Sequence, residues 1–209
     1  MSNPSFTRDE ILELWEHLTP DEQAEIMSLF DQMPIWTPIA GIQTQAYLSK
    51  ATITGYGGAA GGGKTDLAVG LALTEHQRVM IVRDEAKQLK GITDRIIEIV
   101  GHRKGFNSVG GAWTNPVPNC LIDLLGIPNI GDETKMQGVP HDLIVFDETA
   151  NLRESQVRFL MGWLRSADPK QRKRVLMTFN PPTTAEGRWV IDYFKPWLDK
   201  NYEPRAKSG

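Results

Sequence analysis

The sequence of 209 residues contains a single cysteine, no long apolar run and no internal repeat. A lone cysteine, Cys120, cannot close an intrachain disulfide, which excludes a small disulfide-stabilised fold. Because no stretch of about 18 apolar residues is present, the sequence predicts no membrane span. The first ten residues have neither the basic nor the apolar segment of a secretory signal. These absences predict a soluble protein of a reducing, intracellular compartment.

The charge is unevenly distributed, although 23 basic and 26 acidic residues leave a net charge of only −3. Residues 1–50 contain two basic and eight acidic residues, so residues 51–209 carry a small positive excess. The stretch Arg165–Arg174 holds five basic residues and one acidic residue. It is either a solvated loop before a strand or a contact for a polyanion, and the sequence leaves both readings open.

The first 35 residues are predicted to form an acidic helical arm and a linker. Thr7 and Glu10 have the spacing of a capping box, as do Thr19 and Glu22, and each pair precedes an apolar stripe at helical spacing. The proline-containing segment 33–38 is typical of a linker. We therefore expect a helical hairpin, followed by one α/β domain over residues 36–200 and a short tail over residues 201–209.

Apolar runs alternate with helical patterns from residue 51 onward. Such alternation, with strands apolar on both faces, predicts a mostly parallel sheet flanked by helices on both sides. Residues 102–118 are expected to be irregular because glycines and prolines interrupt them. The expected strands are 51–54, 78–82, 120–125, 142–146 and 173–178, and the expected helices are 44–49, 64–76, 85–100, 154–166 and 188–200.

The strongest motif is a glycine-rich loop between the first of these strands and the helix that follows. It fits the pattern G-x-x-x-x-G-K-[ST], in which backbone N–H groups and a helix N-terminus surround phosphates. Lys64 is expected to reach the β- and γ-phosphates of ATP, and Thr65 to ligate Mg²⁺. A flexible glycine hinge is the alternative reading. The motif comprises Gly58, Ala59, Ala60, Gly61, Gly62, Gly63, Lys64 and Thr65.

An acidic pair, Asp147 and Glu148, follows the four apolar residues 143–146. The pair would lie at the carboxyl edge of the sheet, where open α/β sheets bind ligands. Asp147 is expected to hold Mg²⁺, and Glu148 to orient and deprotonate the attacking water. An N-cap for the next helix explains the pair equally well when it is taken alone. The glutamate, and an extra strand expected between the two motifs, favour motor-type P-loop NTPases over switch GTPases.

Together these residues resemble the large terminase subunits of tailed bacteriophages, which are DNA-packaging ATPases. The resemblance covers about residues 36–200. It rests on the segments Gly55–Asp66, Val82–Arg83 with Gln88–Gly91, Gln137–Gly138, His141–Glu148 and Thr178–Pro182. It implies that Asp66 belongs to the nucleotide-binding motif and that Gln43 reads the adenine edge. It also implies that Thr178 and Asn180 couple hydrolysis to movement. The plainer readings are a surface glutamine and an Asn-Pro turn.

The sequence departs from this family in its arginines. Many members carry an arginine within the phosphate loop, where this chain has Ala59 and Ala60, and some carry one where Gln137 stands. The cation that stabilises the transition state is therefore expected to come from elsewhere. The first candidate is Arg165, which the helix after the acidic pair would present to a neighbouring subunit, and the second is Arg83, at a strand end. The alternative for each is a surface salt bridge, which is the more common role of a single arginine.

The resemblance further implies partners and a place of action. Similar terminases continue into a nuclease domain that this sequence does not contain, so no nuclease activity is expected from it. The expected partners are double-stranded viral DNA, the portal protein and the small terminase subunit. The chain is expected to form a ring on the portal in the host cytoplasm and to be monomeric alone. A helicase-like NTPase and a non-hydrolysing nucleotide-binding scaffold are the alternative functions.

Overall fold

The structure, a computed structural model, describes residues 18–25, 33–59, 61–198 and 200. The chain divides into two compact units, Met1–Ile35 and Trp36–Gly209. In the first unit, residues 20–25 are helical. The backbone N–H of Thr19 donates to Glu22 Oε2 at 2.8 Å, and that of Glu22 donates to Thr19 Oγ1 at 3.4 Å. This capping box is therefore confirmed, whereas the pair Thr7 and Glu10 lies outside the described residues.

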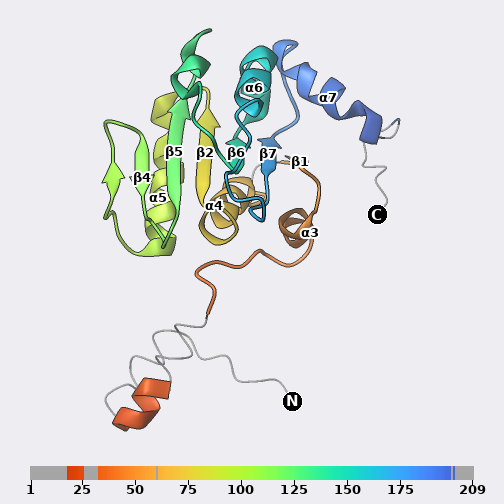
Figure 1. The fold of residues 1–209 in the computed structure, drawn as a ribbon. Coiled ribbons are helices and arrows are strands. Elements are labelled where there is room, and N and C mark those ends of the chain that lie inside the picture. The colour runs from red at the N-terminus through yellow and green to blue at the C-terminus, as the bar shows by residue number, and fades with distance from the viewer. Residues whose placement is uncertain (1–17, 26–32, 60, 199, 201–209) are drawn as a thin grey trace. The chain divides into compact units, whose positions relative to one another are not determined.

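The second unit is built on a seven-stranded sheet in the order β1-β7-β6-β2-β5-β4-β3 (Figure 1). The first five strands of that order are parallel, and β4 and β3 extend the sheet as an antiparallel hairpin. The bounds are β1 Ile53–Gly57, β2 Arg78–Arg83, β3 Phe106–Asn107, β4 Ala112–Thr114, β5 Leu121–Gly126, β6 Leu143–Phe146 and β7 Arg174–Phe179.

Helices cover both faces of the sheet, as the sequence predicts. One apolar cluster joins α3 (Ile42–Leu48), α4 (Lys64–Thr74) and α5 (Leu89–Val100) to alternate side chains of the strands. The strand side chains on the other face of the sheet form a second cluster with α6 (Glu154–Met161) and α7 (Trp189–Phe194). Strands buried on both faces have continuous apolar sequences, and all four residues of β6 are buried.

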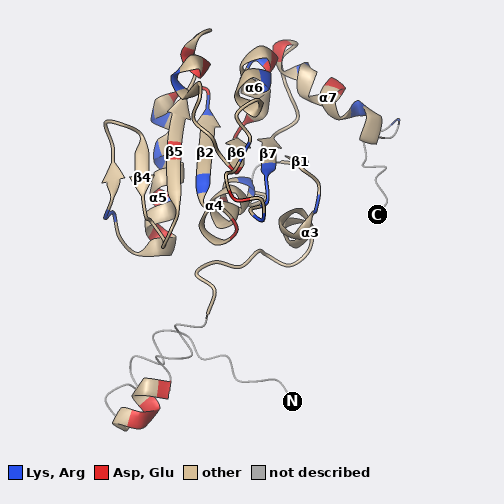
Figure 2. Cartoon of the chain, in the orientation of Figure 1, with Lys and Arg blue, Asp and Glu red and all other residues tan. Residues whose placement is uncertain are grey.

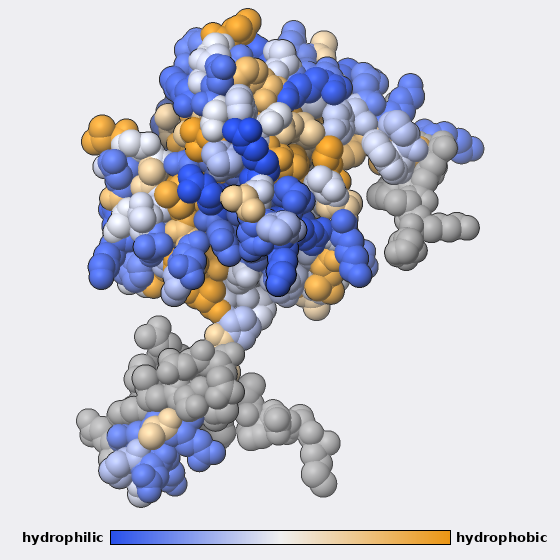
Figure 3. All heavy atoms as spheres, in the orientation of Figure 1, coloured by the Kyte–Doolittle hydropathy of each residue, from blue (hydrophilic) through white to orange (hydrophobic). Residues whose placement is uncertain are grey.

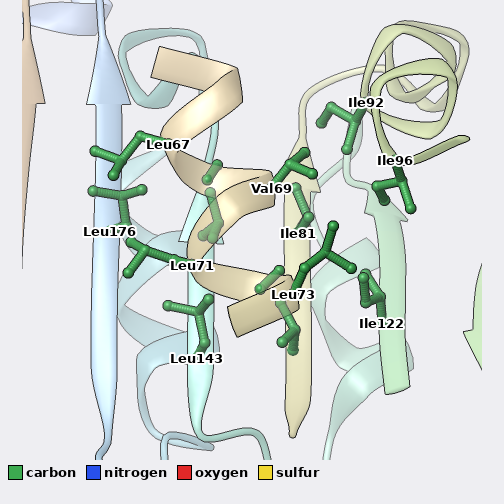
Figure 4. Packing of buried hydrophobic residues seen from close by; sticks show 14 of the residues in the cluster. Leu67, Val69, Leu71, Leu73, Ile81, Ile92, Ile96, Ile122, Leu143 and Leu176 are labelled. Atoms are coloured by element: carbon green, nitrogen blue, oxygen red, sulfur yellow. The ribbon is translucent and has the colours of Figure 1, made fainter. Parts of the chain in front are cut away.

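Helix α4 lies at the centre of the first cluster. Every residue from Leu67 to Leu73 is buried, because the sheet covers one side of the helix and Trp36, α3 and α5 cover others. Figure 4 shows Leu67 and Leu71 beside Leu176 of β7, and Val69 and Leu73 on the side of β2. A Cβ at Gly70 would fall inside the Trp36 indole. This close approach explains a glycine in the middle of a helix, where it is otherwise unfavourable.

The strand order confirms the motor-type arrangement. β7 lies between β1, which precedes the phosphate loop, and β6, which precedes the acidic pair. The predicted motifs on all three strands consequently reach the same carboxyl edge of the sheet. Residue Thr178 pairs with Tyr56 in the ladder, so the end of β7 directly adjoins the start of the phosphate loop.

Several predicted boundaries are wrong. Residues 102–118 include the β3–β4 hairpin, whose two- and three-residue strands are too short for a period-2 pattern to emerge. The helix expected over 154–166 ends at Met161, because Leu164 forms a parallel bridge with His141 instead. The helix expected over 188–200 is α7 flanked by 3-10 turns, with Pro196 in the second turn.

The other differences are shifts of a few residues. β1 begins at Ile53, α3 spans Ile42–Leu48, and α5 begins at Leu89 after a 3-10 turn over Ala86–Gln88. The other predicted strands and α4 match to within two residues at each end. Among the described helices, none has the length and apolar character that crossing a membrane requires.

Candidate nucleotide-binding and catalytic site

The loop between β1 and α4 depends on glycine conformations. Gly58, Gly61 and Gly63 have φ values of 146°, 86° and 65°, in the region that side chains disfavour. The N–H of Gly58 donates to the carbonyl of Phe179 at 3.2 Å, so the loop begins where the β1–β7 ladder ends. Glycines in such conformations allow the backbone to fold around an anion and to aim successive N–H groups at it.

Lys64 and Thr65, the first two residues of α4, follow the loop as the motif predicts. The Lys64 ammonium donates to the carbonyl oxygens of Gly58 at 3.0 Å and Ala59 at 2.6 Å. The loop is thus folded around this cation. Ala60 lies outside the described residues.

Two side chains outside the motif hydrogen-bond to carbonyls of the loop, and the sequence alone predicted neither bond. The Tyr56 hydroxyl donates to the carbonyl of Gly62 at 3.1 Å. The Gln43 amide donates to the carbonyl of Gly63 at 3.0 Å and accepts the N–H of Ile39 at 2.5 Å. Gln43 is 4% exposed, and a Cβ at Gly63 would lie 2.5 Å from its nitrogen. In this structure Gln43 therefore positions the phosphate loop, and its reading of adenine remains a prediction.

Asp147 is the centre of the site. It is 1% exposed, and it accepts hydrogen bonds from Arg83 at 2.6 and 2.9 Å and from Thr65 at 3.3 Å. Its other oxygen accepts the hydroxyl of Thr178. Residues from the phosphate loop helix, β2, β6 and β7 therefore meet at one carboxylate. A buried charge is stable only with such partners.

Glu148 differs from Asp147 in exposure and backbone geometry. Its backbone is left-handed, with φ of 56°, and its N–H donates to Thr178 Oγ1 at 3.2 Å. The carboxylate is 38% exposed and lies 3.6 Å from Arg83. It lines a surface pocket together with Asn151 and Asn180. The structure thus brings Asn180, Thr178 and Glu148 together, as expected, and leaves the carboxylate accessible to water.

Asp66 has a different environment from the one expected of a nucleotide ligand. Its carboxylate accepts the indole N–H of Trp36 at 3.1 Å and pairs with Arg95 at 2.6 Å. The hydrogen-bonded carboxylates Glu98 and Asp66 raise the pKa of Arg95. Asp66 therefore ties the start of α4 to α5 and to the beginning of the second unit.

The two candidate arginines lie at opposite edges of the sheet. Arg83, at the end of β2, contacts both acids and donates to the carbonyl of Gln88 at 3.2 Å. Arg165 is not on α6, contrary to prediction, since the helix ends at Met161. Its backbone N–H donates to His141, which precedes the amino end of β6, and its guanidinium donates to the carbonyl of Gly138. Of these two candidates, Arg83 alone is at the site of its own chain.

Two arginines of the basic stretch 165–174 form hydrogen bonds to backbone carbonyls of the same unit. Arg174 is buried in β7, and its guanidinium donates to the carbonyls of Tyr47 and Ser49. Burial, with the nearby Arg172 as a second cause, lowers the pKa of Arg174 to about 10. Arg172 donates to the carbonyls of Ser49 and Ala51. Two of the five cations therefore anchor the segment before β1.

The donors at the site suit Mg²⁺. Thr65 Oγ1 and Asp147 Oδ2 lie 3.3 Å apart, next to the phosphate loop, and both are oxygen ligands. Mg²⁺ in nucleotide sites keeps several waters and takes few protein ligands besides phosphate oxygens. The described residues contain no group of three or more potential metal-binding His, Cys, Asp or Glu side chains. The residues therefore fit a nucleotide-bound Mg²⁺ better than an ion held by the protein alone.

The fold and this edge define a P-loop α/β protein of the motor type. No protein-family model matches the sequence, and no curated protein matches it. Solved structures do match. The large terminase of a thermophilic bacteriophage is 14% identical, with a TM-score of 0.56 over 77% of this chain and 44% of the terminase. The large terminase of bacteriophage HK97 is 13% identical, with a TM-score of 0.50 over 86% of this chain and 37% of the terminase.

The chain therefore shares its fold with bacteriophage large terminases, which confirms the resemblance seen in the sequence motifs. It spans less than half of the length of either matched terminase.

Proposed function

We propose that this chain is the Mg²⁺-dependent ATPase part of a motor that packages double-stranded viral DNA. The observation that supports this most directly is the convergence of five side chains at the carboxyl edge. Lys64, Thr65, Asp147, Glu148 and Thr178 lie on α4, on β7 and just after β6. Thr65 and Thr178 hydrogen-bond the Asp147 carboxylate, the Glu148 N–H donates to Thr178, and the loop carbonyls hold Lys64.

Nucleotide binding follows from the loop geometry. The backbone N–H groups of the loop and the start of α4 attract the phosphates, and the Lys64 ammonium adds a point charge beside them. Because the loop holds Lys64 through two neutral carbonyls, the ammonium exchanges them for phosphate oxygens without leaving a buried carboxylate unpaired. Thr65 and Asp147 would hold Mg²⁺, which would supply positive charge to neutralise the β- and γ-phosphates.

Hydrolysis is assigned to Glu148. The residue accepts the proton of a water placed in line with the γ-phosphate, and its partly exposed carboxylate has access to that water. The Thr178 hydroxyl donates to the Asp147 carboxylate and accepts the Glu148 N–H. A movement of either acid would therefore alter a hydrogen bond to β7. We propose that Thr178, near the end of β7, and Asn180, just after it, report the state of the site.

The transition-state cation is assigned to Arg83 within one chain. Its guanidinium already lies 2.6 Å from Asp147 and 3.6 Å from Glu148. The loop position of Ala59 carries no charge. Arg165 can serve only a neighbouring copy, because it lies at the opposite edge of its own sheet. For one chain acting alone we therefore propose Arg83, and the action of Arg165 on a neighbouring copy stays a prediction.

The proposed setting is that of a packaging motor. The chain would act on assembling procapsids in the host cytoplasm, as a ring on the portal protein, with the small terminase subunit and duplex DNA as further partners. Both matched solved structures are phage large terminases, which supports this setting through the shared fold.

The test is phosphate release from ATP by the full chain, with and without linear duplex DNA and with and without Mg²⁺. We expect slow Mg²⁺-dependent turnover that DNA stimulates, and no separation of strands in a displacement assay. Strand displacement would favour a helicase-like NTPase instead. Tight ATP binding with no turnover under any of these conditions would indicate a nucleotide-binding scaffold and would contradict the proposal.

A further inference from the structure

The edge of the sheet opposite the phosphate loop collects cations. This amino edge consists of the starts of the parallel strands and the loops that lead into them. In Figure 2, Lys and Arg mark the ends of β2 and β7 opposite the arrowheads. We call the set the amino-edge cations: Lys50, Arg78, Arg103, Lys104, Arg165, Lys170, Arg172 and Lys173. All are exposed except Arg172, which is partly buried.

The topology explains why residues so far apart in sequence share this edge. Lys50 precedes β1, Arg78 begins β2, and the segment 165–173 leads into β7. Helix α5 starts beyond the carboxyl end of β2 and runs back, so Arg103 and Lys104 follow it at the amino edge. The glutamine Gln171 donates to the carbonyl of Glu75, which brings the basic segment against the end of α4.

The amino-edge cations have no carboxylate partners among the described residues. At other places in the unit, cations do pair with acids, among them Lys87, Lys90, Arg95, Lys135 and Arg158. The edge also carries four acids: Glu75 and Asp168 are exposed, and Asp142 and Asp123 hydrogen-bond the buried His76 and His141. Their negative charges offset only part of the eight positive ones, so the edge keeps a net positive charge.

A hollow in the same edge offers neutral hydrogen-bonding groups beside Arg78. Its lining includes Gln77, Thr114, Asn115 and Asn119, whose side chains are donors as well as acceptors. Its thiol, Cys120, is neutral, because burial raises its pKa to about 12. Among the described residues, no carboxylate lines the hollow. Arg78 beside uncharged amides suits a polyanion better than it suits a positively charged partner.

We propose that the amino edge binds the sugar–phosphate backbone of duplex DNA. Proteins hold the backbone mainly with Lys and Arg, assisted by Asn, Gln, Thr and backbone N–H groups, which are the groups present here. The choice of DNA as the polyanion rests on the proposed packaging function. It places DNA and ATP at opposite ends of the same parallel strands, so β7 joins the basic segment directly to Thr178.

The test uses charge reversal at three amino-edge lysines whose side chains form no hydrogen bond or ion pair in the described structure. The variant carries Lys104→Glu, Lys170→Glu and Lys173→Glu. The matched control carries Arg188→Glu, Lys195→Glu and Lys200→Glu, which changes the net charge equally at exposed cations that follow the carboxyl end of β7. Binding to a fluorescent duplex of about 30 base pairs, long enough for the 6–10 phosphate contacts of a typical site, is measured by anisotropy at several salt concentrations.

The amino-edge variant should bind DNA at least tenfold more weakly than the control. Its salt dependence should also be shallower, by about 0.9 in the log–log slope for each phosphate that the variant no longer neutralises. Equal affinity and equal slope in the variant and the control would overturn the proposal.

The result is separable from the proposed function. ATP turnover without DNA should be unchanged in the amino-edge variant, because none of its three lysines is near the phosphate loop. If the wild-type chain hydrolyses no ATP yet the variant alone loses DNA binding, the surface stands and the ATPase assignment fails. If ATP turnover is normal and both variants bind DNA alike, the surface fails and the ATPase assignment stands.

Discussion

The carboxyl and amino edges of the sheet differ in the partners of their cations. At the carboxyl edge, Arg83 pairs with Asp147 and Glu148, and the loop carbonyls hold Lys64. At the amino edge, the exposed cations face solvent without acidic partners among the described residues. Figure 3, which displays one face of the molecule, shows hydrophilic residues over much of that face. A site for chemistry thus holds its charges with oppositely charged neighbours or polar groups, whereas a surface for a polyanion leaves its cations without carboxylate partners.

The largest expected effect is at Lys64. Replacing it with Ala should weaken ATP binding on the order of 100-fold, since a charge-assisted hydrogen bond is worth about 1.5–3 kcal/mol. Turnover should be lost with it. Lys90→Ala, on the exposed face of α5, is the control and should bind normally. Fluorescent-nucleotide titration measures both, and unchanged affinity in Lys64→Ala would show that the phosphate loop does not hold the nucleotide.

The next effect separates the two arginines. Arg83→Met should lower turnover by about 10³, the smaller end of the range for an arginine finger. Arg165→Met in the dilute chain should leave turnover close to that of the wild type, because Arg165 lies at the other edge. Steady-state phosphate release is the measurement, and equal losses in the two variants would contradict the assignment of Arg83.

A neighbouring copy could still use Arg165, and a mixing experiment decides this. Chains with Arg165→Ala are combined with chains carrying Lys64→Ala under conditions that assemble the ring. We expect the mixture to hydrolyse ATP no faster than the sum of the rates of the two variants measured separately. Recovery would show that Arg165 acts between copies, and it would restore Arg165 as the first candidate for the transition-state cation.

A smaller effect is expected at Thr178, which links the acids to the strand shared by both edges. Thr178→Val removes the hydroxyl that bonds Asp147 and Glu148 while keeping the shape of the side chain. Losing a hydrogen bond of about 1.5 kcal/mol corresponds to roughly tenfold in turnover. Thr178→Ser should restore the rate. Wild-type turnover in Thr178→Val would mean that the hydroxyl only packs β7 against β6.

The smallest effect is on the free energy of unfolding and concerns two glycines of the helices α4 and α5. Gly91→Ala on α5 should stabilise the fold by about 0.5–1 kcal/mol, because a new methyl there meets nothing within 4 Å. Gly70→Ala on α4 should instead destabilise it by about 1–3 kcal/mol, because the methyl would overlap Trp36. Urea denaturation compares the two, and equal shifts would contradict the packing described for α4.

The fold and the carboxyl edge were largely predictable, because both rest on local patterns. Continuous apolar runs indicated the parallel strands, and the residue types around Lys64 and Asp147 indicated their chemistry. The partners of Gln43, Asp66 and Arg83 were not predictable. Each depends on contacts between residues at least 20 positions apart, which spacing in one sequence cannot supply. The arrangement of the amino edge needed the strand order as well.

The most direct test of the carboxyl edge is a pair of measurements on Glu148→Gln. The amide keeps the shape of the side chain and cannot take a proton from water. Our account predicts ATP affinity close to that of the wild type in equilibrium titration. It also predicts that single-turnover hydrolysis slows by about 10²–10⁴, the usual contribution of a general base. Hydrolysis at the wild-type rate, with ATP bound at that edge, would contradict it.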